Sequence, residues 1–253
     1  MPEHSDHRRF ADRTVIVTGA GSGIGLAAAV RIAGEGGHVV AADLDSARLD
    51  DLVKLCGNES VTSVDGDITE PEVLNRIVAA AGSRIDGLAN VAGIMDGFVP
   101  PSEVDDALWE RVLNLNLTAT MRLTRAVLPA MIAAGRGSIV NVASEAAYRA
   151  SAAGAAYTTS KHAVVGYTSS VAFFHGPQGV RSNAVAPGPT ITNIDGGMRS
   201  QYAAVRGGPV MKATMPKPVA PEQVAASIVW LLSDDAANVN GAILPSDGGW
   251  SVA

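Results

Sequence analysis

The sequence predicts an α/β fold in a single domain, with a doubly wound parallel β-sheet and helices on both of its faces. Short apolar runs with the length of buried strands alternate with segments of helical periodicity along the 253 residues, without a linker or an internal repeat. The apolar content of 47% includes only 4% aromatic residues, as expected of parallel strands buried between helices. A chain of this length suits one α/β unit with a large core.

The first predicted unit is a strand, a glycine-rich turn, a helix and a second strand. The apolar run 13–18 predicts a buried strand, and the turn Gly19-Ala-Gly-Ser-Gly-Ile-Gly25 follows it directly. The Ala-rich segment 26–35 predicts a helix, so the glycines lie where free amides and the helix dipole favour a phosphate. Segment 36–43 predicts the second strand. It ends in Asp43, eighteen residues after the turn and close to the roughly 20 expected for an acid that binds the adenosine ribose.

The alternation continues to the carboxyl end of the chain. Further strands are predicted at 61–67, 88–93, 138–143, 180–185 and within 241–249. Further helices are predicted at 46–56, from Pro71 onward, at 105–133 and at about 155–174. Such a sheet binds its ligands at the carboxyl ends of the strands, where the motifs described below are expected to lie.

The predicted helix 105–133 carries apolar residues around more than one face, which indicates burial on two sides. The sheet can cover one side. A second copy of the chain is the favoured cover for the other side, and a segment of the same chain is the alternative.

A YxxxK pattern, formed by Tyr157 and Lys161, lies on the second long helix, and its two residues share one face. A nearby ammonium favours the ionised form of a phenol, so a group that normally titrates near pH ~10 becomes a usable acid or base closer to neutrality. Ser144 lies at the end of the strand 138–143 and would donate a hydrogen bond to the reacting oxygen. The pattern therefore predicts a site that moves a proton.

Several motifs together resemble those of the classical short-chain dehydrogenases/reductases (SDR family), in order and spacing. They are TGxxxGxG from Thr18 to Gly25, Asn90-Val-Ala-Gly93, Asn116, Ser144, YxxxK and Pro187-Gly188, and the resemblance extends from about Phe10 to Val252. One departure is Val91, which replaces an asparagine of the family's NNAG. The resemblance implies a Rossmann-like fold, a nicotinamide dinucleotide cofactor, and a homotetramer or homodimer packed through the two long helices.

The resemblance also implies the roles of four residues. Tyr157 is expected to be the catalytic acid or base, and Ser144 to polarise the substrate oxygen. Lys161 is expected to lower the pKa of the tyrosine and to bind the nicotinamide ribose. Asn116 is expected to hold a proton-relay water, and its neighbour Asn114 is the residue that could be confused with it.

The residues implied for cofactor binding lie in the glycine turn and after successive strands. They are Gly19, Gly21, Ser22, Gly23, Ile24, Gly25, Asp43, Leu44, Asp67, Ile68, Asn90, Ala92, Gly93, Tyr157, Lys161, Pro187, Gly188, Thr190 and Thr192. The alternative for Asp67 is that it caps the helix from Pro71. Charge favours NAD(H) over NADP(H), because Asp43 would repel a 2′-phosphate, and neither Ser22 nor Leu44 provides a cation to neutralise one.

Segment 189–218 lacks regular periodicity and contains several glycines and methionines, which is typical of a mobile substrate lid. Its cations could draw an anionic substrate group or belong to a solvated loop; they are Arg199, Arg206, Lys212 and Lys217. The residues expected to line the substrate pocket are Ser144, Glu145, Tyr157, Ile94, Met95, Tyr148 and Met198. Glu145 is expected either to bind a substrate hydroxyl or to face water.

These expectations define an NAD(H)-dependent oxidoreductase that interconverts a secondary alcohol and a ketone by hydride transfer at a Ser-Tyr-Lys-Asn site. The alternative within the same class is a reductase of 3-oxoacyl thioesters carried on acyl-carrier protein or CoA. The alternative of another class is a non-catalytic NAD(H)-binding sensor or scaffold, which has no need of all four site residues.

Composition and charge argue against other classes. A net charge of −6 without a basic cluster argues against nucleic acid, and no apolar run approaches the ~20 residues that span a bilayer. The five histidines lack metal-site spacing, and no GxSxG of a serine hydrolase occurs. Residues 1–9 predict a flexible tail without a signal peptide, and the single Cys56 is expected to be an apolar filler near a helix end. A cytoplasmic enzyme is therefore expected.

Overall fold

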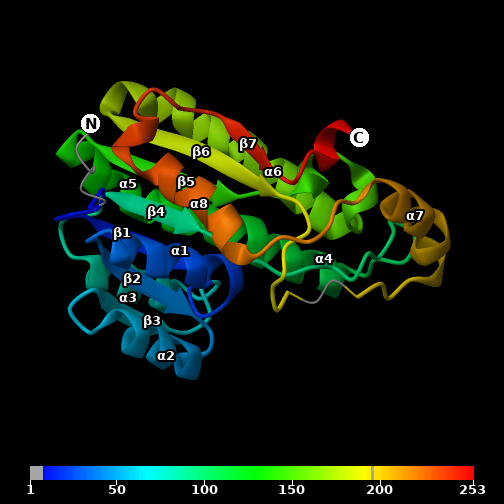
Figure 1. Cartoon of the computed structure of the whole chain (residues 1–253), viewed down its shortest axis with the longest axis horizontal. Coiled ribbons are helices and arrows are strands. Elements are labelled where there is room, and N and C mark those ends of the chain that lie inside the picture. Colours follow the sequence, from blue (N-terminus) through cyan, green and yellow to red (C-terminus); the bar gives the residue numbers. More distant parts are fainter. Residues whose placement is uncertain (1–7, 195–196) are drawn as a thin grey trace, which may run out of the picture.

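The computed structural model describes residues 8–194 and 197–253. Within these residues the centre is a seven-stranded parallel sheet in the order β3-β2-β1-β4-β5-β6-β7 (Figure 1). The strands are β1 (Thr14–Thr18), β2 (His38–Asp43), β3 (Val61–Asp65), β4 (Gly87–Asn90), β5 (Gly137–Val142), β6 (Val180–Pro187) and β7 (Ile243–Ser246). The strand order reverses between β1 and β4, and doubly wound sheets bind ligands beside such a point.

Helices follow the strands and cover both faces of the sheet. They are α1 (Gly23–Gly34), α2 (Ser46–Cys56), α3 (Pro71–Ala81), α4 (Asp106–Leu113), α5 (Thr120–Ala134), α6 (Ala155–His175), α7 (Gln201–Thr214) and α8 (Pro221–Leu232). Short helical turns complete the described chain: the π-helix η1 (Asn114–Ala119) and the 3-10 helices η2 (Glu145–Ala147), η3 (Ala150–Ala152), η4 (Gly176–Gln178), η5 (Asp234–Ala236) and η6 (Trp250–Val252).

Two apolar layers attach these helices to the sheet. On one face, α1, α2 and α8 pack against strand residues such as Val17 and Val140. On the other face, α3, α5 and α6 pack against the alternate strand residues, among them Ile16 and Ile139. Successive side chains of a strand point to opposite faces, so each central strand contributes to both layers. The predicted doubly wound α/β fold is confirmed.

The predicted helix 105–133 is a helical segment built from α4, η1 and α5. The π turn of η1 interrupts the regular α-helix in the middle of this segment. Single π turns inside α-helices are frequent at functional sites, and this one carries Asn116.

Two helices lie where none was predicted. Helix α8 begins at Pro221 and buries an apolar face that includes Val224 and Ile228. Helix α7 lies in segment 189–218, so the prediction that this whole segment lacks regular structure is wrong over Gln201–Thr214. The helix was not predicted because it contains Gly207-Gly-Pro209, and glycine and proline are poor helix formers. Helix α7 extends beyond the carboxyl ends of the strands (Figure 1), and Asp195 and Gly196 lie outside the described residues.

Residues 1–7 of the predicted tail lie outside the described part of the chain. Arg9, the last residue assigned to that tail, forms an ion pair with Glu35 at 2.7 Å and another with Asp235 at 3.2 Å. Phe10 beside it is buried. The packed part of the domain therefore includes Arg9 and begins earlier than predicted.

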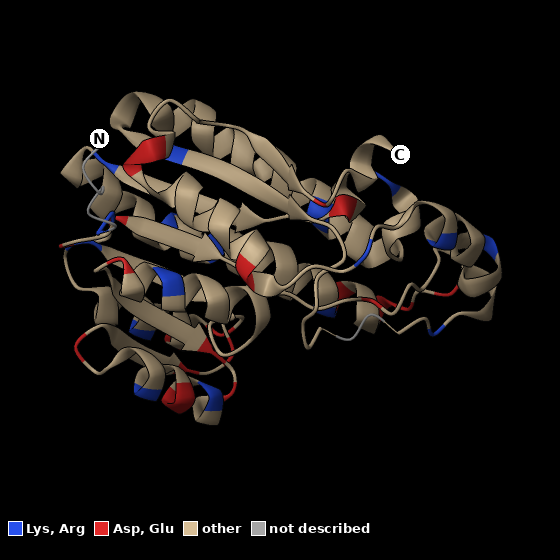
Figure 2. Cartoon of the chain, in the orientation of Figure 1, with Lys and Arg blue, Asp and Glu red and all other residues tan. Residues whose placement is uncertain are grey.

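Basic and acidic residues are interspersed over the cartoon and do not gather on one element (Figure 2). None of the described helices combines the length and the apolar content that a membrane-spanning segment requires. In residues 8–194 and 197–253, no cluster of three or more His, Cys, Asp or Glu is placed to hold a metal ion. Cys56 is the last residue of α2 and packs half-buried against an apolar layer, which confirms it as an apolar filler.

Candidate active site

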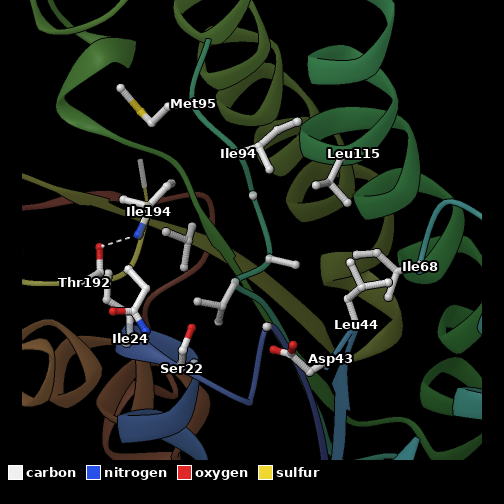
Figure 3. Close-up of a pocket in the computed structure, with 18 of the residues that line it drawn as sticks. Ser22, Ile24, Asp43, Leu44, Ile68, Ile94, Met95, Leu115, Thr192 and Ile194 are labelled. Carbon is white, nitrogen blue, oxygen red and sulfur yellow. Dashed lines mark hydrogen bonds between the residues drawn. The ribbon is translucent and has the colours of Figure 1, made fainter. Parts of the chain in front are cut away.

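A cavity of ≈ 770 Å³ lies at the carboxyl ends of the strands, and segments that follow β1 through β6 line it. Figure 3 shows its two ends. Asp43 and Leu44 lie on one side, Thr192 and Ile194 lie on the opposite side, and Ser22 of the glycine turn lies between them. An elongated ligand that reaches both ends must therefore cross the start of α1.

The glycine turn after β1 exposes its backbone to this cavity. A Cβ on Gly25 would overlap the carbonyl oxygen of Gly19, so no larger residue fits there. Ser22 precedes α1 in an extended conformation, and its side chain makes no capping hydrogen bond. The first amides of α1 are left free for an anion, which the helix dipole also attracts. This turn fits the pyrophosphate of a dinucleotide.

Asp43 ends β2, and two backbone amides fix its carboxylate. Oδ2 accepts a hydrogen bond from the amide of Gly21 at 2.8 Å, and Oδ1 accepts one from the amide of Asp45 at 3.1 Å. The carboxylate lies on the cavity wall, in the position expected for an acid that binds ribose hydroxyls. Gly21 holds this carboxylate but does not itself line the cavity.

Asp67, which the sequence predicts to bind the cofactor, lines the cavity. Its Oδ1 accepts a hydrogen bond from the amide of Thr69 at 2.8 Å, and the N-cap of α3 is Glu70. The alternative that Asp67 caps α3 is therefore wrong.

Tyr157 and Lys161 lie one turn apart on α6, beside the end of β5, which is three strands away from the Asp43 strand β2 in the sheet. The ammonium of Lys161 is 5.4 Å from the centroid of the Tyr157 ring, and it donates a hydrogen bond to the carbonyl oxygen of Val142 at 2.8 Å. A side-chain hydrogen bond joins Tyr157 to Ser144, which follows β5. All three predicted residues line the cavity.

Burial controls the ionisation of this group. It raises the pKa of Tyr157 to about 12; the hydrogen bond with Ser144 lowers this pKa, and the charge of Asp96 raises it further. Burial also lowers the pKa of Lys161 to about 8. Loss of hydration is the largest influence on the pKa of Tyr157, and it acts against the lowering that the YxxxK pattern predicts. At neutral pH Tyr157 is a protonated phenol and Lys161 is mostly an ammonium.

Asn116 is buried in η1, and its side chain hydrogen-bonds to neighbouring segments. Oδ1 accepts a hydrogen bond from the amide of Ile94 at 2.9 Å, and Nδ2 donates to the carbonyl oxygen of Ile94 at 3.0 Å and to Ser160 Oγ at 3.1 Å. A Cβ on Gly93 would lie 3.2 Å from Oδ1 of Asn116 and 3.5 Å from Nζ of Lys161. Asn116 thus fixes the segment after β4 beside Lys161 without lining the cavity itself.

Two predicted site residues are buried elsewhere in the protein. Asn90 donates a hydrogen bond to Oδ1 of Asn141 at 2.8 Å, so its amide joins β4 to β5 and does not face the cavity. Glu145 is 1% exposed and forms an ion pair with Arg149 at 2.6 Å. Burial and a hydrogen bond with Asp247 raise the pKa of Glu145, while Arg149 lowers it. Neither of the two environments expected for Glu145, a substrate pocket or water, is present.

Tyr148 and Met198, both predicted to contact the substrate, are partly exposed and do not line the cavity. The hydroxyl of Tyr148 donates a hydrogen bond to the carbonyl oxygen of Ile243 at 3.3 Å, which turns the ring toward β7.

The remaining predicted residues do line the cavity: Gly19, Ser22, Gly23, Ile24, Gly25, Leu44, Ile68, Ala92, Gly93, Ile94, Met95, Pro187, Gly188, Thr190 and Thr192. Several lining residues were not predicted, among them Arg48, Arg111, Leu115 and Ile194. Arg48 could have been found, because the first turn of a helix that follows a strand faces the same edge as the strand's end. Arg111 belongs to no local pattern that places it there. Arg199, one of the predicted lid cations, also lines the cavity, and so does Asn114, the neighbour of Asn116.

A parallel sheet with a phosphate-binding turn and a buried tyrosine–lysine pair beside one cavity defines a dinucleotide-dependent oxidoreductase. A sequence model described as short chain dehydrogenase matches residues 13–203. The chain therefore belongs to the short-chain dehydrogenase family, and the resemblance stated above is confirmed.

Relatives match over nearly their whole length. Short-chain dehydrogenase/reductase cdmF of Talaromyces verruculosus is 40% identical over 253 residues, covering 95% of this chain and 97% of the relative. The 3beta-hydroxysteroid dehydrogenase 2 of Eggerthella lenta is 37% identical over 263 residues, covering 99% of each. A crystal structure from Beutenbergia cavernae, assigned as an NAD(P)-dependent gluconate 5-dehydrogenase with NADP bound at low occupancy, is 36% identical with a TM-score of 0.83, covering 96% of this chain and 98% of that one.

Proposed function

We propose that this protein is an NAD(H)-dependent oxidoreductase that interconverts a secondary alcohol and a ketone. The observation that carries the proposal is the placement of Tyr157, Ser144 and Lys161 at one end of a cavity whose other end contains Asp43. The glycine turn between the two ends fits a pyrophosphate, so a dinucleotide held at Asp43 would extend toward the tyrosine.

A bound nicotinamide dinucleotide would supply or accept the hydride, and the residues of the chain handle the proton of the substrate oxygen. Tyr157, with a pKa of about 12, is protonated at neutral pH and can donate its proton to a ketone oxygen. Ser144 is joined to the same phenol and can donate a hydrogen bond to the oxygen as negative charge develops on it. The ammonium of Lys161 stabilises the phenolate that proton donation leaves behind. In the oxidation direction that phenolate accepts the hydroxyl proton.

Asp43 supports NAD(H) as the preferred cofactor. Two amides hold its carboxylate in place, so it can accept hydrogen bonds from ribose hydroxyls without moving. The same fixed charge would repel a 2′-phosphate. The NADP in the Beutenbergia structure is bound at low occupancy to a protein described as NAD(P)-dependent.

The lining of the catalytic end supports an apolar cyclic alcohol or ketone as substrate. Ile94, Met95 and Ile194 line the part of the cavity that lies away from Asp43 (Figure 3), and methionine adapts to varied apolar shapes. The relative from Eggerthella lenta is named for a hydroxysteroid, which is a substrate of this kind. Of the four lid cations, Arg199 alone is on the cavity wall, which gives little support to a thioester with a phosphorylated carrier.

Assembly into a homo-oligomer is supported by an exposed aromatic pair on α6. Phe173 and Phe174 are 76% and 66% exposed. Their rings pack edge to face, with 5.1 Å between the ring centroids. Two adjacent exposed phenylalanines are unusual on a free surface and are suited to contact with a second copy. We expect light scattering to give a dimer or tetramer for the wild type and a smaller species when both are replaced by serine. A monomeric wild type would contradict the assembly.

The activity can be tested by following reduced cofactor at 340 nm with a panel of 3-hydroxysteroids, cyclohexanols, gluconate and 3-hydroxyacyl thioesters. We expect NAD-linked turnover, highest on the cyclic apolar alcohols, and turnover lower by about 10²- to 10⁴-fold with the Tyr157→Phe variant. Turnover restricted to thioesters would replace the substrate class. Tight NADH binding without turnover of any panel member, in both directions, would favour the sensor alternative.

A further inference from the structure

The end of the cavity that contains Asp43, where the proposed cofactor would place its adenosine, also contains a cation. Arg48, in the first turn of α2, lines the cavity together with Asp43 and Leu44. Both side chains lie close to Gly21. A Cβ added to Gly21 would lie 2.8 Å from the carboxyl carbon of Asp43 and 2.9 Å from the Cβ of Arg48. The carboxylate and the arginine stem therefore flank the same glycine.

The two charged groups differ in how firmly they are held. The carboxylate of Asp43 accepts hydrogen bonds from two backbone amides and cannot turn away without breaking them. Among residues 8–194 and 197–253, the guanidinium of Arg48 forms an ion pair with Asp45 alone, at 3.2 Å, and the two side chains are 47% and 43% exposed. An ion pair with this much exposure to water contributes little to stability, so Arg48 can exchange Asp45 for a better partner.

A 2′-phosphate would be such a partner. The planar guanidinium offers paired donors that match a phosphate, and its charge does not depend on pH in the physiological range. Helix α2 carries residues of both signs (Figure 2), so no general positive field accounts for binding at this end. A 2′-phosphate at this end would be repelled by the fixed carboxylate of Asp43 and attracted by the guanidinium of Arg48.

We infer that Arg48 is a determinant of cofactor choice, a phosphate-binding cation whose effect Asp43 opposes. This inference rests on the proposed dinucleotide site. NAD(H) is then preferred because Asp43 is fixed and adjacent, and not because the end of the cavity lacks a cation. Removal of the Asp43 charge alone should leave a site that already accepts the phosphorylated cofactor.

The inference can be tested by calorimetric titration of NAD⁺, NADP⁺ and adenosine 2′,5′-bisphosphate into four proteins: the wild type, Asp43→Asn, Arg48→Ala and the double variant. Asparagine keeps the shape of Asp43 and one acceptor for the amides. We expect Asp43→Asn to bind NADP⁺ at least about tenfold more tightly than the wild type does.

Adding Arg48→Ala to Asp43→Asn should weaken NADP⁺ and the bisphosphate by about 10- to 100-fold, because a charge-assisted contact is lost. NAD⁺ affinity should change by less than about fivefold, since it loses only an exposed charge. Lys54→Ala is the matched control. Lys54 is on the same helix, pairs with Asp51 and does not line the cavity, so its removal from Asp43→Asn should leave the ratio of the two affinities unchanged.

Equal weakening of NAD⁺ and NADP⁺ by Arg48→Ala, or an unchanged bisphosphate affinity, would overturn the inference while leaving the proposed function intact. A wild type that binds neither dinucleotide would instead overturn the proposed function. Because Arg48 and Lys54 are both exposed, thermal melting should show folded proteins in every case.

Discussion

The carboxylate of Asp96 accepts a hydrogen bond from the backbone amide of Tyr157, with 2.9 Å between Oδ2 and the nitrogen. Its other oxygen accepts from the amides of Gly154 and Phe98, both at 3.0 Å. The Asp96 side chain is completely buried and joins the segment after β4 to the start of α6. Free amides and the dipole at a helix N-terminus stabilise a carboxylate, so Asp96 fixes the turn that carries the reactive phenol.

The negative charge of Asp96 also raises the pKa of Tyr157, so Asp96→Asn should lower that pKa. Oxidation of an alcohol requires the phenolate, and we expect the rising limb of its pH profile to move to lower pH in this variant. The profile of kcat against pH measures the shift. Asp50→Asn, an exposed carboxylate on α2, is the control and should leave the limb in place. Identical profiles for the wild type, Asp96→Asn and Asp50→Asn would show that the charge of Asp96 does not influence the pKa of Tyr157.

Tyr157→Phe should lower kcat by about 10²- to 10⁴-fold, because the proton donor is lost while the ring still fills its place. The dissociation constant for NADH, measured by fluorescence titration, should remain close to that of the wild type. Tyr167→Phe is the matched control on α6, since its hydroxyl lies away from the cavity and hydrogen-bonds to the carbonyl oxygen of Met121 at 3.4 Å and to the side chain of Thr124. Comparable losses in the two variants would mean that the phenol of Tyr157 has no chemical role.

Lys161→Met should stabilise the fold near pH 7 even though it abolishes turnover. The pKa of Lys161 is about 8 in the folded protein and 10.5 ordinarily. Below pH 8 the buried amine is therefore protonated, although the folded state binds this proton less tightly than the unfolded state does, and this difference lowers the stability of the fold. Replacing the lysine removes this destabilisation, which is at most about 3 kcal/mol. It also removes the hydrogen bond to the carbonyl oxygen of Val142, which contributes about 1 kcal/mol, so the free energy of unfolding should rise by roughly 2 kcal/mol.

That gain should shrink as the pH rises from 8 toward 10.5, because the wild-type lysine is then neutral in both states. Urea denaturation of both proteins at pH 7 and at pH 10 measures it. A gain that is the same at the two pH values would show that the charge of Lys161 is not the cause.

Gly25→Ala should prevent dinucleotide binding and lower the melting temperature, because the added Cβ would overlap the carbonyl oxygen of Gly19. Gly34→Ala, at the other end of α1, is the matched control. A Cβ on Gly34 would meet nothing within 4 Å, and alanine in a helix is favoured over glycine by about 0.5–1 kcal/mol, so this variant should be slightly more stable. Calorimetric binding and thermal melts would separate the two, and a Gly25→Ala protein with normal NAD⁺ affinity would contradict the placement of the pyrophosphate.

The parts of the site that could be predicted are those that chemistry requires at short, fixed spacing. Gly19 to Gly25 must form a tight turn before a helix, and Tyr157 and Lys161 must share one helical face. Asp43 could be predicted because one helix and one strand of ordinary length separate it from the turn. In each case the requirement lies within a single supersecondary unit of the sequence.

The parts that could not be predicted depend on contacts between distant segments. Asp96 looks like an ordinary loop residue until the fold places it 2.9 Å from the amide of Tyr157. The high pKa of Tyr157 comes from burial, which local spacing does not encode. Glu145 has the sequence position of a pocket residue, but Arg149 draws it into the interior. Helix α8, in contrast, begins with Pro221-Glu222, a recognisable start signal, and could have been predicted.

The π turn of η1 makes the length of this part of the chain unusually intolerant of change. The π turn holds one more residue than an α-helical turn would. Deleting a single residue from it would rotate the side chains of α5 by about 100° about the helix axis relative to those of α4. Either Asn116 would keep its hydrogen bonds to Ile94, or α5 would keep Leu123 and Val127 in the apolar layer, but both could not hold together. Insertions and deletions accumulated over evolution should therefore be tolerated in the lid and avoided across Asn114–Ala119.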